Sequence, residues 1–360
     1  MEMEPREPEK MDLSLEDLQE AQQAKATAQE QGFLDPGSKP INVVGLGVGP
    51  KQEGGEPTGE PAVLVLVSQK VSSDLLEEAD QIPEELEGHR TDVVAIGSPV
   101  ALGHGASAEA GAQSLATRVR PAQGGYSVGH FRITAGTIGT CVYDMLPGGA
   151  TNPPGHGIGI PPRFYILSNN HVLADSNNAV PGDPILQPGR VDGGRDPADR
   201  IARLSRFVPI TFNPPTPLAQ HRNLVDAAVA EGQFHDLNRE IYWNGYVQAW
   251  RPRQHIRTGL LVRKTGRTTN FTTGRIQAIN ATVDVTYGGG RVARFVDQIV
   301  TTNISAGGDS GSLVTTFDER ACCNVAVGLL FAGSSVATIV NHIEHVRSLL
   351  RVEVAEAINR

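Results

Sequence analysis

The sequence predicts a mainly β protein that ends in a helix and begins with a small α+β domain. Helix signals are weak, whereas 40 glycines and 24 prolines separate many short runs rich in β-branched residues. About a dozen of these runs follow one another from Gly125 onward, and an amphipathic segment with apolar positions at helical spacing occupies 337–358. This pattern favours two antiparallel β-barrels side by side, followed by a helix.

Residues 1–39 are predicted to form a polar N-terminal arm that is partly disordered or helical. The arm is acidic and helix-prone, and it has few apolar side chains beyond Leu13, Leu15 and Leu18. Such a composition buries too little apolar surface to order a whole segment. We therefore expect a mostly solvated arm with one short helix.

Residues 40–99 are predicted to form a small domain of order ββαβ. The expected elements are strands over 41–50 and 61–71, a short helix over 73–86 broken by Pro83, and a strand over 91–97. The second strand, "PAVLVLVSQKV", is apolar enough to need a cover, so the domain should pack on the barrels or on a neighbouring subunit. It would either restrain access to the barrels or support folding and oligomerisation. Residues 100–124 are interpreted as a linker, and 125–360 as the barrel domain.

Charge and cysteine content narrow the class of function. Acidic residues outnumber basic ones by 40 to 31, which argues against a nucleic-acid partner. No apolar run is long enough to span a bilayer, and no secretory signal is visible, so no membrane partner is expected. The three cysteines do not suggest a disulfide framework, which favours a reducing, cytoplasmic setting.

The segment "ISAGGDSGSLV" at 304–314 places Ser310 among glycines, where a structural strand would carry bulkier side chains. A serine hydroxyl becomes a nucleophile when a histidine takes its proton and a carboxylate orients that histidine. His171 stands at the end of the apolar run "FYILSNNHVLA", and Asp226 lies among apolar residues in "NLVDAAVA". Taken singly, each has an ordinary structural interpretation. The competing candidates lie in looser contexts: His104, His156, His221, His342, His345, Asp175 and Asp183.

The glycines beside Ser310 have a chemical explanation. Acyl transfer passes through an oxyanion that backbone N–H groups stabilise when no bulky side chain blocks the approach. Gly308 and Ser310 can supply two such N–H groups, and glycines on both sides permit a tight turn. These residues are therefore the predicted oxyanion hole.

Three motifs in chain order resemble those of chymotrypsin-like (trypsin-fold) serine proteases. "GGDSGS" is similar to the nucleophile motif, "LSNNHVLA" to the histidine motif, and "VDAAVA" to the aspartate motif. "VRKTGRTTNFTTGRI" resembles a strand pair of many bacterial members, and the "LSNNHVLA" style resembles bacterial and plant proteases akin to NARROW LEAF 1. The resemblance covers roughly 120–350. It implies a trypsin-like fold of two six-stranded barrels, with catalytic residues His171, Asp226 and Ser310.

The resemblance also places a substrate pocket and leaves one carboxylate to explain. Motif alignment puts five residues at the pocket: Ile304, Ser305, Leu330, Phe331 and Gly333. None is charged and none is a histidine, so a small or apolar residue is expected before the scissile bond.

Asp309 lacks the new N-terminal amine that pairs with the corresponding aspartate in digestive zymogens. An internal donor is therefore expected, such as an arginine or backbone N–H groups.

The sequence and its resemblance thus predict a serine endopeptidase that acts on a protein or peptide substrate. If residues 40–99 support oligomerisation, further copies of the same chain are also partners. No metal or organic cofactor is implied. Two alternatives use the same fold: a scaffold or interaction protein whose triad is weak or inactive, and an esterase that cleaves activated esters with the same machinery.

Overall fold

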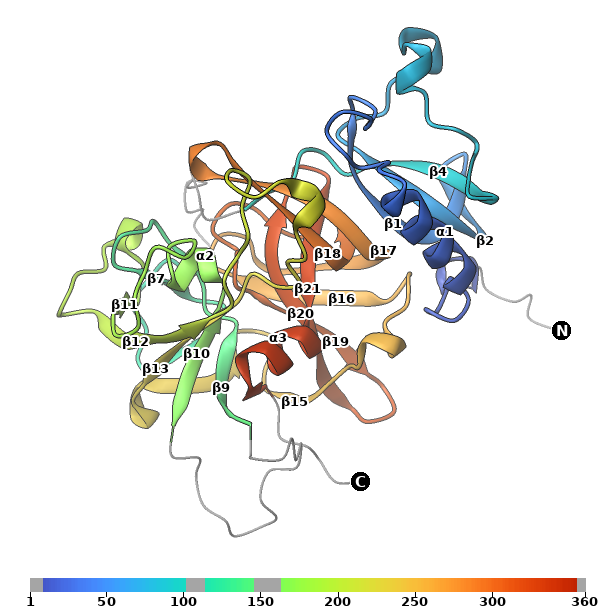
Figure 1. Cartoon of the computed structure of the whole chain (residues 1–360). Coiled ribbons are helices and arrows are strands. Elements are labelled where there is room, and N and C mark those ends of the chain that lie inside the picture. Colours follow the sequence, from blue (N-terminus) through green and yellow to red (C-terminus); the bar gives the residue numbers. More distant parts are fainter. Residues whose placement is uncertain (1–8, 102–113, 146–162, 355–360) are drawn as a thin grey trace, which may run out of the picture.

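The computed structural model describes residues 9–101, 114–145 and 163–354 (Figure 1). The C-terminal half forms a closed barrel, drawn in orange and red. Its strands are β16 (Leu261–Gly266), β17 (Asn270–Tyr287), β18 (Arg291–Thr302), β19 (Leu313–Asp318), β20 (Cys323–Gly333) and β21 (Ala337–His342). They pair in the order β16-β17-β18-β21-β20-β19, and β19 pairs with β16, which closes six strands into a barrel.

A second, curled sheet lies beside the barrel (Figure 1, green to yellow). Its order is β22 (Val352–Glu353), β9 (Thr140–Asp144), β10 (Phe164–Ser168), β13 (Ala228–Gly232), β12 (Arg200–Phe207), β11 (Pro184–Leu186), β7 (Ser127–His130) and β8 (Gly136–Thr137). Two further strands, β6 (Ala122–Gly124) and β14 (Leu237–Ile241), pair with each other, and β15 (Val247–Trp250) pairs with β20. The mainly β, trypsin-like architecture is therefore confirmed, with one closed six-stranded barrel and an open, curled sheet in place of the second closed barrel.

The C-terminal helix α3 (Ile343–Leu350) is also present, but it is shorter than the periodicity of 337–358 suggests. Residues 337–342 form strand β21, and every residue of this strand is buried. An apolar run that is covered on both faces does not show which secondary structure it adopts. The helix begins only where one face of the chain meets solvent.

The N-terminal unit is built on a sheet of β1 (Val43–Glu53), β2 (Glu56–Val67), β4 (His89–Ala95) and β3 (Glu85–Leu86). The prediction of a helix over 73–86 is wrong, because the structure has two short 3₁₀ helices there, η2 (Ser73–Leu75) and η3 (Glu78–Asp80). Neither of them buries a residue, so residues 73–80 lack the buried apolar contacts that would hold an α-helix. Other 3₁₀ helices are η1 (Glu9–Met11), η4 (Arg190–Asp192), η5 (Leu218–Gln220), η6 (Phe234–Asp236), η7 (Arg253–His255) and η8 (Gly288–Gly290).

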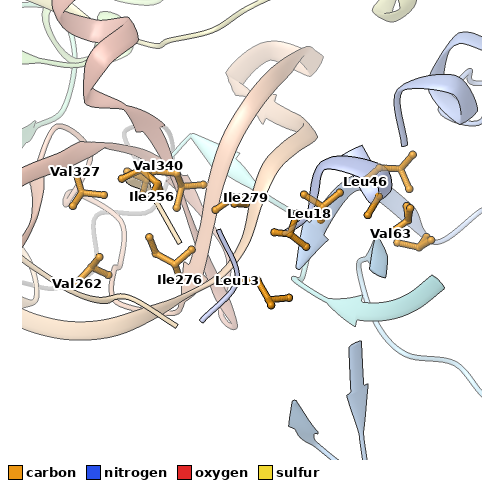
Figure 2. Close-up of a cluster of buried hydrophobic side chains, with 14 of the residues drawn as sticks. Leu13, Leu18, Leu46, Val63, Ile256, Val262, Ile276, Ile279, Val327 and Val340 are labelled. Atoms are coloured by element: carbon orange, nitrogen blue, oxygen red, sulfur yellow. The ribbon is translucent and has the colours of Figure 1, made fainter. Parts of the chain in front are cut away.

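The N-terminal arm is more ordered than its composition suggests. Helix α1 (Gln19–Glu30) lies on the N-terminal sheet and buries three alanines together with Lys25. Leu13 and Leu18 enter an apolar core that continues into the closed barrel and includes Ile276 and Ile279 (Figure 2). Small alanines, which carry little weight in a hydrophobicity pattern, here allow the helix to approach the sheet closely.

The N-terminal sheet and the barrel are joined through β1 and β17, which pair antiparallel. The alternating glycines of "VVGLGVG" explain this contact. A Cβ atom on Gly45 would lie 2.2 Å from the carbonyl oxygen of Thr282, and one on Gly49 would lie 2.8 Å from the carbonyl oxygen of Gln277. Strand β5 (Val100–Ala101), in the segment interpreted as a linker, also pairs with β17 and β20. Among the described residues, no helix is long and apolar enough to cross a membrane.

We expect Gly45→Ala to destabilise the protein, because the new methyl group would collide with the backbone of β17. Overpacking of this kind costs about 1–3 kcal/mol of unfolding free energy. Gly37→Ala is the matched control, since nothing lies within 4 Å of a Cβ atom there. Thermal unfolding of both variants provides the comparison. Equal melting temperatures for the two variants would contradict a close β1–β17 junction.

Candidate active site

His171 and Asp226 meet where two neighbouring strands of the curled sheet come together. Helix α2 (Asn170–Leu173) follows β10 and carries His171, while Asp226 lies just before β13, the neighbour of β10. His171 Nδ1 lies 2.6 Å from Asp226 Oδ2, and the side chains of both residues are 0% exposed. A carboxylate can only accept, so Nδ1 carries the proton and Nε2 is the acceptor nitrogen of the neutral ring.

Further hydrogen bonds hold the Asp226 carboxylate and its backbone. The backbone N–H of His171 donates to Oδ1 at 3.1 Å, and the Tyr287 hydroxyl donates to Oδ2 at 2.7 Å. Asn169 donates to the Asp226 carbonyl at 2.7 Å, and the Asp226 N–H donates to Asn341 Oδ1 at 3.0 Å. Both carboxylate oxygens are therefore hydrogen-bonded, as a buried charge requires.

Ser310 lies on the turn between β18 and β19, and it is buried. Its hydroxyl donates to the carbonyl of Phe331 at 3.2 Å. Gly136 lies between this turn and helix α2: a Cβ atom there would be 2.9 Å from the Ser310 carbonyl oxygen and 2.5 Å from Val172 Cγ2. The structure thus places Ser310 next to the helix that carries His171.

Hydrogen bonds to the carbonyl oxygens of Gly307 and Asp309 fix two peptide planes next to Ser310. Thr268 Oγ1 donates to the Gly307 carbonyl at 2.7 Å, and the Ser312 N–H and hydroxyl donate to the Asp309 carbonyl at 3.0 and 2.6 Å. In a trans peptide the C=O and the following N–H point in opposite directions. The N–H groups of Gly308 and Ser310 therefore point away from these donors. Gly308 has φ +99°, a left-handed conformation that favours glycine.

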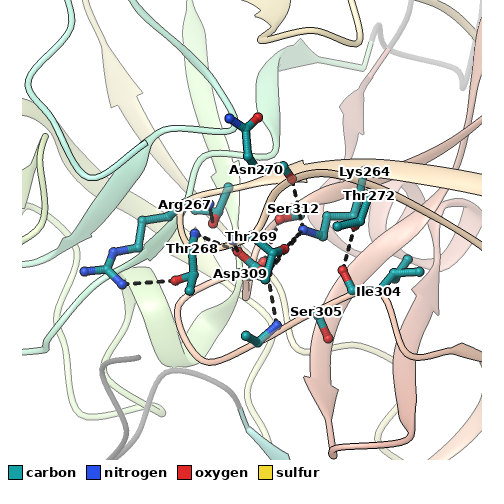
Figure 3. Close-up of polar contacts among 12 residues, drawn as sticks. Lys264, Arg267, Thr268, Thr269, Asn270, Thr272, Ile304, Ser305, Asp309 and Ser312 are labelled. Carbon is teal, nitrogen blue, oxygen red and sulfur yellow. Dashed lines mark hydrogen bonds and ion pairs between the residues drawn. The ribbon is translucent and has the colours of Figure 1, made fainter. Parts of the chain in front are cut away.

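Asp309 is anchored by five donors from three segments of the chain: Lys264, residues 268–269 and Ala306 (Figure 3). Oδ2 accepts from Lys264 Nζ at 3.1 Å, Thr269 Oγ1 at 2.6 Å and the Ala306 N–H at 3.0 Å. Oδ1 accepts from the N–H groups of Thr268 and Thr269 at 2.8 and 3.2 Å. The internal donors expected for Asp309 are therefore present, and the charged one is a lysine.

Lys264 is fully buried with its partner. Burial lowers the pKa of its ammonium group, and the negative charge of Asp309 acts in the opposite direction. Lys264 also donates to the Asn270 carbonyl at 3.1 Å and to Thr269 Oγ1, so its other donors are used by the turn that follows β16 and the first residue of β17. The ammonium group is thus held by the same turn that supplies the other donors to Asp309.

The same turn contacts the curled sheet. Arg267 forms a bidentate pair with Asp192, in which Nε lies 2.9 Å from Oδ2. The Arg267 N–H donates to Thr137 Oγ1 at 3.0 Å, and this hydroxyl donates to the Gly308 carbonyl at 2.8 Å. The turn carrying Ser310 is therefore fixed to both β units.

The five residues predicted to line a substrate pocket are buried, but their side chains lie in different parts of the core. Ile304 and Leu330 belong to the core that continues into the N-terminal unit, whereas Phe331 packs in another cluster against Phe295, with ring centroids 4.6 Å apart. Leu330 and Phe331 point to opposite faces because neighbouring residues of a strand alternate. The hydroxyls of Ser305 and Thr338 share a hydrogen bond of 2.7 Å, and Gly333 pairs with Thr338 across β20 and β21.

The competing candidates have other partners. His221 contacts the Thr216 carbonyl at 2.9 Å, Asp183 pairs with His130 at 3.0 Å, and both His342 and His345 face Asp297. His104 and His156 lie outside the described residues. Asp175 is a half-buried residue with φ +48° in the loop after α2. Within the described ranges, no group of three or more His, Cys, Asp or Glu side chains could hold a metal ion.

Two residues at this site were not singled out from the sequence. Lys264 stands in an ordinary alternating strand, and only the buried Asp309 calls for a cation. Tyr287 ends β17, where the alternation of Val283 and Val285 predicts an inward side chain but not its partner.

The model for the NARROW LEAF 1 N-terminal domain matches residues 37–96. Thermobifida fusca Protease A is a similar solved structure, with 17% identity and a TM-score of 0.42, over 65% of this chain and 98% of that one. Nocardiopsis protease has 17% identity and a TM-score of 0.40, over 64% and 97%. A glutamic acid specific serine protease, which utilizes a histidine triad in substrate binding, has 19% identity and a TM-score of 0.41, over 64% and 98%. No curated protein matches the chain.

We expect Lys264→Met to destabilise the protein strongly, because Asp309 would keep a buried charge without its cation. Removal of one partner of a buried pair costs about 3–5 kcal/mol of unfolding free energy. Lys51→Met is the control, since Lys51 pairs at 2.8 Å with Glu53, whose side chain is 67% exposed. Such a pair is worth at most about 1 kcal/mol. Chemical unfolding that shows equal losses for the two variants would contradict this role of Lys264.

Proposed function

We propose that the chain is a serine endopeptidase that hydrolyses peptide bonds with Ser310, His171 and Asp226. The observation that carries the proposal is the buried 2.6 Å hydrogen bond between His171 and Asp226, on a helix that lies, like the glycine-rich turn of Ser310, against Gly136. A fixed imidazole whose Nε2 accepts a proton is the general base that a serine nucleophile needs.

In the proposed reaction, Ser310 Oγ bonds to the peptide carbonyl carbon while His171 Nε2 takes the hydroxyl proton. The carbonyl oxygen becomes an oxyanion that accepts hydrogen bonds from the N–H groups of Gly308 and Ser310. His171 then gives the proton to the amine as the C–N bond breaks, which leaves an acyl group on Ser310. Water, deprotonated by His171, releases this group, and Asp226 stabilises the imidazolium formed in each half.

The Ser310 hydroxyl contacts the Phe331 carbonyl, so the proposal includes a rotation of its χ1 angle toward His171 when substrate binds. Catalytic hydrogen bonds are often completed only in the substrate complex. Only the Ser310 side chain needs to move in this step, because the rest of the turn is already anchored through Asp309. The substrate class we propose is a protein or peptide.

For the N-terminal unit, the contacts favour a supporting role over a removable restraint. Its strand β1 extends the barrel sheet, and its residues Leu13 and Leu18 share a core with the barrel. Deletion of the unit would expose this core and the paired edge of β17. We therefore propose that the unit supports the folding of the barrel.

We expect Ser310→Ala and His171→Ala each to lower kcat/KM for a peptide substrate by on the order of 10⁴-fold or more, because the two residues act as one unit. The controls are Ser348→Ala and His235→Ala, which change exposed residues of the same types. A fluorophosphonate probe should label wild type and both controls, and should not label Ser310→Ala. Wild-type protein that resists the probe would favour the inactive scaffold. Labelling with hydrolysis of esters alone would favour the esterase.

The sites that the protein cleaves would also reveal which residue it prefers before the scissile bond. The segments 304–305 and 330–333 carry no carboxylate and no histidine, so we expect small or apolar residues before the scissile bond. New N-termini in a cell lysate, compared between wild type and Ser310→Ala, measure this preference. A profile dominated by Arg, Lys or Glu would contradict it.

A further inference from the structure

We propose that Tyr287 is a positioning residue for the catalytic pair: its hydroxyl holds the Asp226 carboxylate against His171 and limits how strongly His171 retains a proton. This inference rests on the proposed function. Tyr287 comes from the closed barrel, whereas His171 and Asp226 come from the curled sheet. The tyrosine therefore joins the two β units at the site where the chemistry is proposed.

The carboxylate oxygen that faces His171 is shared. Asp226 Oδ2 accepts from His171 Nδ1 at 2.6 Å and from the Tyr287 hydroxyl at 2.7 Å. Tyr287 is 2% exposed, so water does not compete freely for this bond. A hydrogen bond to a charged acceptor is about twice as strong as a neutral one. Two donors on one oxygen leave the carboxylate little freedom to turn away from the imidazole.

Aromatic packing fixes the direction of the Tyr287 hydroxyl. Its ring meets Phe212 edge-on at a centroid distance of 5.1 Å and stacks on Phe295 at 6.3 Å. It also lies edge-on to the His171 ring, at 6.0 Å and 79°. Because the ring is enclosed on several sides, loss of the hydroxyl alone should leave its position unchanged. Tyr287→Phe therefore removes one hydrogen bond and keeps the packing.

The hydroxyl remains a donor over the working pH range. Burial raises the pKa of Tyr287 well above its usual value, and the negative charge of Asp226 acts in the same direction. Arg291 is the other charged group that acts on Tyr287, and its positive charge acts in the opposite direction. The titratable and charged groups of this cluster are thus His171, Asp226, Tyr287 and Arg291.

The sign of the effect follows from the sharing of charge. The Tyr287 hydroxyl stabilises the negative charge on Oδ2, so less of this charge is available to an imidazolium at His171. Loss of the hydroxyl should therefore raise the pKa of His171. Because catalysis needs neutral His171, the acidic limb of the pH–rate profile should move to higher pH.

The test compares full-length Tyr287→Phe with Tyr165→Phe. Tyr165 is also buried, at 1% exposed, and donates to the Asp144 carboxylate at 2.9 Å, away from the site. For Tyr287→Phe we expect kcat/KM to fall by about tenfold to a hundredfold, as loss of a hydrogen bond to a charged group allows. The acidic limb should move up by about one pH unit. Tyr165→Phe should match wild type in both.

An NMR titration of the His171 imidazole separates this inference from the proposed function, since it needs no turnover. A raised His171 pKa in Tyr287→Phe supports the inference even if wild type proves inactive, in which case only the proposed function fails. A His171 pKa equal to that of wild type overturns the inference, whatever the activity. A fall in kcat/KM with an unmoved acidic limb and unmoved pKa also overturns it, because that pattern indicates a merely structural role.

Discussion

The buried carboxylate of Asp309 is the constraint on which the rest of the candidate site depends. An unpaired charge in the interior would be very costly, so its neighbours must supply a cation and enough donors. They do so with Lys264, three backbone N–H groups and a hydroxyl. With both oxygens held, the turn on either side of Asp309 has one arrangement, and this arrangement directs the N–H groups of Gly308 and Ser310. The turn 266–269 that holds Asp309 also reaches across to Asp192 through Arg267.

Strand β17 links this site to the N-terminal unit. Its middle pairs with β1 at Val283, and its last residue, Tyr287, contacts Asp226. The glycines that let β1 approach therefore act on the same strand that reaches the His171–Asp226 pair. The N-terminal unit shares a continuous sheet and a common core with the barrel, so it belongs to the folded body of the protein. Its deletion should lower the free energy of unfolding more than it changes the access of substrate to the site.

The sequence was most informative where chemistry demands an unusual composition. The glycines around Ser310 and the aspartate within an apolar run pointed to candidate site residues, because few structural needs produce them, and the alternating runs predicted the barrel. Predictions were weakest where tertiary contacts decide the outcome. The acidic segment 73–86 had helix-favouring residues, but its two 3₁₀ helices bury no side chain, and the alanines of α1 gave no hydrophobic signal. Lys264 and Tyr287 were ordinary strand residues until the fold placed each of them against a buried carboxylate.

The central claim is that the anchored turn presents two N–H groups to an oxyanion formed at Ser310. A crystal structure of the protein after reaction with a small fluorophosphonate tests this directly. We expect phosphorus bonded to Ser310 Oγ, with one phosphoryl oxygen about 2.7–3.1 Å from the nitrogens of both Gly308 and Ser310. The Lys264–Asp309 contact should be unchanged. A phosphoryl oxygen that points away from both nitrogens, or a phosphonyl group on another residue, would contradict the account.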